Sequence, residues 1–124
     1  MIGATIKSLL VANAGLTALV PEASIFPYVA NPDTPYPLIT YTVDALKPEY
    51  TKTGWAGDVC NFSVTSWSAD FANLQLISAQ VRLALDLKKS TGLLRITLIG
   101  FQEGPGEDSF FAKLSFQVKV NSYS

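Results

Sequence analysis

Apolar and polar side chains alternate along residues 110–120, "FFAKLSFQVKV", near the end of the chain. The apolar set is Ala112, Leu114, Phe116, Val118 and Val120, and the polar set is Lys113, Ser115, Gln117 and Lys119. Successive side chains of a β-strand point to opposite faces of the sheet, so this pattern predicts a strand with one face on a core and one on solvent. The chain is therefore expected to build a sheet that is covered on one side.

Three further segments have the composition or the alternation of strands. Residues 38–43, "LITYTV", are β-branched and aromatic, residues 59–67 alternate in polarity, and residues 93–101, "LLRITLIGF", precede the final strand. Five prolines from Pro21 to Pro37 predict an extended surface segment, since proline removes a backbone donor. One short edge strand at 25–29 is compatible with that segment.

Two segments show helical spacing. Ile2, Ile6, Leu9 and Leu10 predict a short helix over residues 2–13. A second stripe predicts a long core helix from Ser68, as its N-cap, to Leu87. Its members are Phe71, Leu74, Ile77, Val81 and Leu85, widened by Leu76, Ala79 and Leu83.

The order of these elements is α-β-β-α-β-β within 124 residues. We therefore predict a single domain over residues 1–124, because this length supplies one core. The predicted fold is α+β, with a four-stranded, largely antiparallel sheet covered on one face by the long central helix and the short N-terminal helix.

Composition excludes several classes of function. The net charge of −1 argues against nucleic acid as the main partner. The chain has no histidine and one cysteine, Cys60, so a Cys-His pair, a Ser-His-Asp triad and a zinc site are all unsupported. No apolar run reaches the ~20 residues that cross a bilayer, and Lys7 interrupts the N-terminal apolar stretch. We expect a cytoplasmic start with an amphipathic helix, and no membrane partner.

Carboxylates are the remaining candidates for chemistry. Asp44, Glu49 and Asp58 lie in or beside the segment 44–58, and Glu103, Glu107 and Asp108 lie in the last hairpin. A buried pair could carry acid/base catalysis, but solvated loop charges are the simpler interpretation. Cys60 is interpreted as a buried, inert thiol. The prediction is therefore a protein that is not an enzyme and has no metal or cofactor.

The segment 44–58 is interpreted as a long loop, far longer than the two to five residues of a usual hairpin connection. We expect it to be exposed and mobile in isolation and ordered against a neighbour. Tyr50 and Trp55 are the predicted anchors, while Lys47, Glu49 and Lys52 would set orientation. For Trp55, packing back on the domain is an equal alternative. The second projecting hairpin carries Glu103, Glu107 and Asp108.

The ordered pieces of the chain carry a resemblance. They are a short N-terminal helix, "SIFPYVANPDTPYPLITYTV", the polar insertion "KPEYTKTG", "CNFSVTSWSADFANLQLISAQVRLAL" and a closing hairpin. In this order the chain resembles the tail-completion, or tail-terminator, proteins of long-tailed bacteriophages, the small head-to-tail joining family. It departs from many members at Glu22–Ser24, where they carry a Gly-Asp-Arg-like run.

The resemblance implies a virion structural protein: six copies in a ring that caps the tail tube, stops its polymerisation and joins it to the head. Its partners would be further copies of itself, the tail tube protein and the head connector protein. It would reside at the head–tail junction after assembly in the host cytoplasm. The residues alone also allow a small α+β ligand-binding or regulatory module without catalytic activity.

Overall fold

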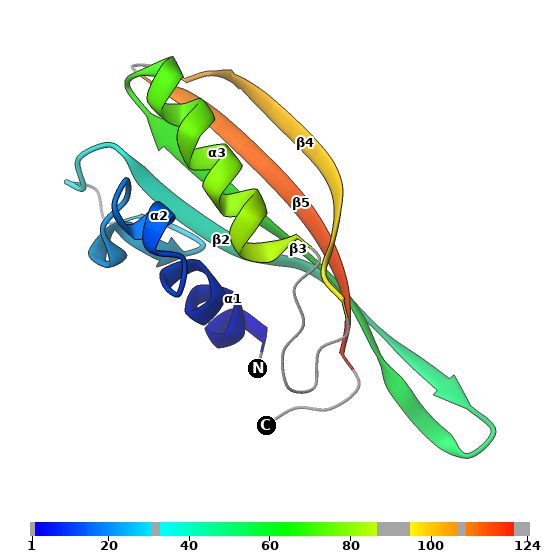
Figure 1. Ribbon diagram of the computed structural model, residues 1–124. Helices are drawn as coiled ribbons and strands as arrows, with labels where there is room; N and C mark the ends of the chain where they lie inside the picture. The colour runs from blue at the N-terminus through cyan, green and yellow to red at the C-terminus, as the bar shows by residue number, and fades with distance from the viewer. Residues whose placement is uncertain (1, 31–32, 87–94, 107–108, 121–124) are drawn as a thin grey trace.

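Figure 1 shows the computed structural model, which describes residues 2–30, 33–86, 95–106 and 109–120, the side chains of Ile2 and Trp55 excepted. The helices are α1 (Ile2–Val11), α2 (Ala14–Thr17), the 3₁₀ turn η1 (Glu22–Ser24) and α3 (Phe71–Leu85). The strands are β1 (Ile25–Pro27), β2 (Leu38–Thr51), β3 (Gly54–Ser68), β4 (Thr97–Pro105) and β5 (Phe110–Val120).

The strands form one five-stranded sheet in the order β1-β2-β3-β5-β4. The pairs β2–β3, β3–β5 and β4–β5 are antiparallel, and β1 pairs with β2 in parallel through Ile25↔Ile39 to Pro27↔Tyr41. The predicted four-stranded, largely antiparallel sheet is therefore wrong, although the class is α+β. The short edge strand that the sequence allowed at 25–29 is present as β1, but the predicted sheet did not include it, because three residues that end in a proline give almost no periodic signal.

The α-helices all cover the same face of the sheet, with α3 across β3 and β5, and α1 and α2 beside it over β2 (Figure 1). The core lies between these layers. Its strand residues include Phe62, Val64, Leu114, Phe116 and Val118, all with at most 2% of their surface exposed. The alternation that predicted one buried face on β5 is thereby confirmed.

The central helix is shorter and narrower in its buried stripe than predicted. Asp70, rather than Ser68, caps it by accepting the Ala72 N–H at 3.1 Å, while the Ser68 hydroxyl accepts the Asp70 N–H. Leu74, Ile77, Val81 and Leu85 are fully buried, as the stripe predicted. Leu76, Ala79 and Leu83 were expected to widen the stripe, but they lie on the side of the helix away from the core and are exposed. Phe71, the first predicted member of the stripe, is also exposed.

The N-terminal helix ends earlier than predicted, at Val11, and a second short helix follows it. Asn13 makes this break, since its side-chain oxygen accepts the Leu16 N–H and caps α2. The Asn13 amide also donates to the Gln80 carbonyl at 3.3 Å. This hydrogen bond links the junction of the two N-terminal helices to α3.

Candidate assembly interface

The segment 44–58 is a β-hairpin and not a loop. Strand β2 continues to Thr51, and its pairing with β3 extends, through two bulges, to Thr51↔Gly54. Within the described residues, strand β5 accompanies β3 from Asp58 onward, where Asp58 faces Val120. In the part of the chain that the structure describes, the outer part of the hairpin is therefore two-stranded, and it projects away from the helices and the rest of the sheet (Figure 1).

Local chemistry explains why the hairpin closes tightly. Lys52 and Thr53 form a two-residue connection, and Gly54 follows at φ +124°, a conformation that side chains disfavour. The Thr51 hydroxyl oxygen accepts the Thr53 N–H at 3.3 Å and lies 2.9 Å from the Thr53 hydroxyl. The residues that suggested a loop thus make a turn.

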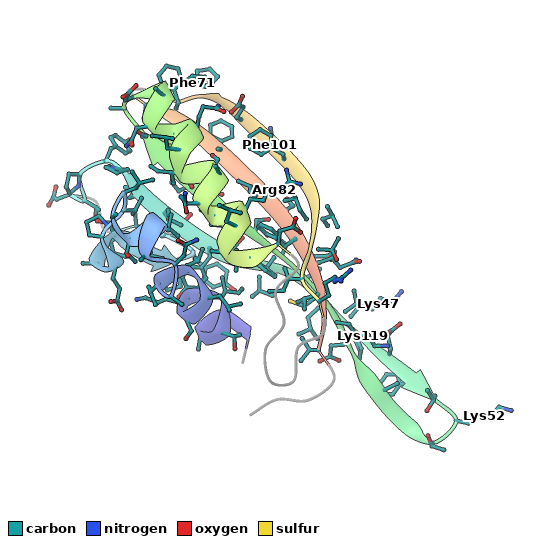
Figure 2. All side chains as sticks on the ribbon, viewed as in Figure 1. Lys47, Lys52, Phe71, Arg82, Phe101 and Lys119 are labelled. Carbon is teal, nitrogen blue, oxygen red and sulfur yellow. The ribbon has the colours of Figure 1, made fainter. Side chains whose placement is uncertain are left out.

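The predicted anchors and orienting residues lie on this hairpin. Tyr50 is 71% exposed. Lys47 and Lys52 are also exposed, with Lys52 at the tip (Figure 2). Glu49 forms an ion pair with Lys119 of β5, with Nζ and Oε1 3.2 Å apart, and so fastens the hairpin to the end of β5. The side chain of Trp55 lies outside the described residues, and its role as an anchor stays a prediction.

Two carboxylates lie at the base of the hairpin. Asp44 accepts hydrogen bonds from the Thr42 hydroxyl, at 3.0 Å, and from the Ser63 hydroxyl of β3. Asp58 is buried, with 6% of its surface exposed. The bond from Ser63 thus joins β2 to β3 where a bulge between Val43 and Ala45 shifts the register.

The second hairpin, between β4 and β5, lies at the other end of the sheet. Phe110 at the start of β5 pairs with Ser68 at the end of β3, so this turn and the β2–β3 tip point in opposite directions. Glu103 accepts a hydrogen bond from the Gln75 side-chain amide of α3 at 2.8 Å. Glu107 and Asp108 lie outside the described residues.

The structure does not bring the described carboxylates of the two hairpins together. Asp44 is on β2 and Glu103 on β4, which are separated by two strands. Within the described ranges there is no cluster of three or more Cys, Asp or Glu side chains placed to hold a metal ion. No helix among the described residues has both the length and the hydropathy needed to span a membrane.

Cys60 is fully buried in the core, as predicted. Burial, and secondarily the negative charges of Asp44 and Asp58, raise the pKa of its thiol to about 11. A thiol with such a pKa stays protonated at neutral pH and is a poor nucleophile.

Sequence reasoning missed one prominent residue, Tyr28. It follows β1 with a positive φ of 62°, which is rare for an aromatic residue, and it is 61% exposed. Its side chain lines two hollows, one of about 360 Å³ with Trp67 and one of about 600 Å³ with Lys7. The sequence signal for Tyr28 was weak: it is an aromatic residue within a proline-rich segment, and that segment was interpreted only as an extended surface connection.

The sheet is covered by helices on one face, and its β2–β3 hairpin projects from the domain (Figure 1). The sequence matches the family described as tail completion protein gp17 over residues 4–119. The chain belongs to this family, whose members are structural proteins of phage tails. The family prediction made from the ordered sequence pieces is confirmed.

Solved structures show the same fold. A chain from the virion of a native gene transfer agent particle is 24% identical, with 94% of this chain and 92% of that chain covered and a TM-score of 0.79. A second structure is 14% identical, with coverages of 96% and 95% and a TM-score of 0.58. None of the curated proteins matches the sequence.

Proposed function

We propose that this protein forms a hexameric ring on the end of the phage tail tube, stops tube polymerisation and joins the tail to the head connector. It would act at the head–tail junction of the virion, after assembly in the host cytoplasm, and without catalysis. Membership of the tail completion family supports a role in the tail. The ring, its six copies and its position are the proposal.

The observation that carries this proposal is the projecting hairpin. A domain that folds alone gains little from a two-stranded arm, because hairpins without a third strand or a packed face have marginal stability in water. The arm keeps Tyr50 and two lysines exposed away from the core. Exposed aromatic side chains on a projecting element suit contact with a neighbouring protein.

Deletion of the gene from the encoding phage or prophage tests this function. Electron microscopy of the lysate should show filled heads separated from tails, and tails of irregular length. The wild-type gene supplied in trans should restore joined particles and uniform tails. Joined particles with tails of normal length in the deletion strain would contradict the proposal.

A further inference from the structure

A groove lies at one edge of the sheet, where α1 passes over β1 and β2. It has a volume of about 600 Å³, and its lining includes Gly3, Ala4, Lys7, Tyr28, Val43 and Leu46. Most of these groups are apolar, and Leu46 is 39% exposed. Beyond Tyr41, β2 has no described strand partner on this side. The groove is thus open laterally, at the base of the hairpin.

An apolar ridge lies at the opposite edge, along β4 and the start of α3. Ile99 and Phe101 of β4 are each 53% exposed, and Phe71 of α3 is 46% exposed. Phe71 packs edge-to-face against Phe110, with ring centroids 5.4 Å apart. Figure 2 shows Phe71 and Phe101 at the end of the sheet remote from the hairpin. Grouped apolar side chains on a surface mark sites of contact.

Each surface carries a charge that has no ionic partner among the described residues. In the groove this charge is Lys7, which forms no ion pair with any described residue. On the ridge it is Glu103, whose carboxylate accepts a hydrogen bond only from the neutral Gln75 amide. The two edges are therefore complementary both in apolar character and in the sign of charge.

We propose that the ridge of one copy docks in the groove of the next copy, with Glu103 of the ridge facing Lys7 of the groove. This inference rests on the proposed ring and says which surfaces build it. The contact is head-to-tail, because groove and ridge lie on opposite edges of the same sheet. Every copy then keeps one surface free for a further copy, and the chain of contacts closes when the rotation permits.

A second copy is the occupant that the structure favours. The groove and the ridge are parts of one chain, so every assembly of this protein brings equal numbers of both. Docking would cover Phe101, Ile99 and Leu46 together and pair Lys7 with Glu103. A contact of groove with groove, or of ridge with ridge, would instead bring like charges together, which costs affinity.

Charge reversal tests the pairing of Lys7 with Glu103. Phage lacking the gene would be supplied with Lys7→Glu, Glu103→Lys or both together, and infectious particles counted. Each single variant should lower the count at least about tenfold, since like charges would then face each other. The double variant should recover most of the loss. Lys113→Glu makes the same charge change on the uncovered face of the sheet and should leave the count unchanged.

Cysteine cross-linking tests the direction of the contact, using Leu46→Cys in the groove and Phe101→Cys on the ridge. The native Cys60 is buried and is the only cysteine of the chain, so it does not interfere. After mild oxidation of isolated tails, the double variant should give a ladder of linked chains, and each single variant should stay monomeric.

Dimers from a single variant would mean that like surfaces meet, which overturns the inference. Two results together would also overturn the inference and leave the proposed function intact. The first is joined particles that contain the cysteine double variant but give no ladder of linked chains. The second is a normal count of infectious particles for both single charge reversals. If deletion of the gene leaves tails joined and uniform, the function itself fails, and the inference fails with it.

Discussion

Phe116 of β5 stacks on Phe62 of β3, with ring centroids 5.3 Å apart, and both side chains are fully buried beneath the helices. Phe116→Ala should lower the free energy of unfolding by about 3–5 kcal/mol, because it removes apolar burial and leaves a cavity. Lys113→Ala, on the other face of the same strand, should change it little. Urea denaturation measures both, and equal effects would contradict the assignment of the buried face.

Cys60 gives a pH dependence of known sign. Its thiol pKa is raised from 9.0 to about 11 in the folded protein, so folding favours the neutral form. The contribution of the neutral thiol to the free energy of unfolding is fully present below pH 9, and it is lost as the pH rises from about 9 through 11. Cys60→Ala should therefore flatten the decline of unfolding free energy over this window.

Denaturation of the wild-type protein and Cys60→Ala at a series of pH values measures this difference. The comparison of slopes is needed because Cys60→Ala also shifts stability at every pH by changing the packing. A decline of the same steepness in both proteins would show that the thiol does not titrate with an altered pKa.

At the scale of elements, the hairpin and the core should respond independently to substitution. Tyr50→Ala and Trp55→Ala should leave the thermal midpoint nearly unchanged while reducing the yield of joined heads and tails. Phe62→Ala should lower both, since Phe62 is fully buried. A melt and an assembly assay on one preparation distinguish these outcomes, and a large loss of stability with Trp55→Ala would mean that its ring packs within the domain.

A shortened hairpin tests the whole element. Residues 49–57 would be replaced by Asn-Gly, a dipeptide that favours a tight turn. The contacts of β3 with β5 begin at Asp58 and would be retained, so the variant should fold with a thermal midpoint close to that of the wild type. It should not complement the gene deletion. Normal complementation would show that the arm is dispensable.

The sequence predicted an element well where one of its faces is buried. It predicted an element poorly where both faces are exposed, as in the outer part of the β2–β3 hairpin. The alternation on β5 and four members of the α3 stripe were recognised because burial repeats at a fixed spacing. Leu76 and Leu83 were misassigned because exposed leucines look the same as buried ones in a one-dimensional pattern. Pro48, Gly54 and Gly57 favour a loop when the sequence is read alone, although a proline is tolerated in an edge strand, and here Gly54 ends the turn while Gly57 lies beside a bulge.

The candidate site was only partly accessible from the sequence for the same reason. The segment and its exposed Tyr50 were identified, but the groove beneath α1 depends on the parallel pairing of Ile25 with Ile39. Lys7, Tyr28 and Leu46 are far apart in the sequence, and the pairing of β1 with β2 brings them to one groove. No local pattern encodes it.

At the scale of the whole molecule, a cyclic ring built from head-to-tail contacts has two unlike faces. All copies are related by one rotation axis, so every hairpin must leave the ring with the same inclination to that axis. Reconstruction of tail ends by electron microscopy should therefore show one crown of arms and not two. Arms on both faces of a single ring would contradict cyclic symmetry.

Strand β3 is one continuous segment that lies in two different surroundings. From Asp58 to Ser68 it is flanked by β2 and β5, whereas from Gly54 to Gly57 its one partner among the described strands is β2. Local opening of the outer part breaks few contacts, so its amide hydrogens should exchange with solvent much faster than those of the inner part. On assembly, protection should spread outward along the strand from Asp58, and the residue at which it stops would mark how far a neighbouring molecule reaches along the arm.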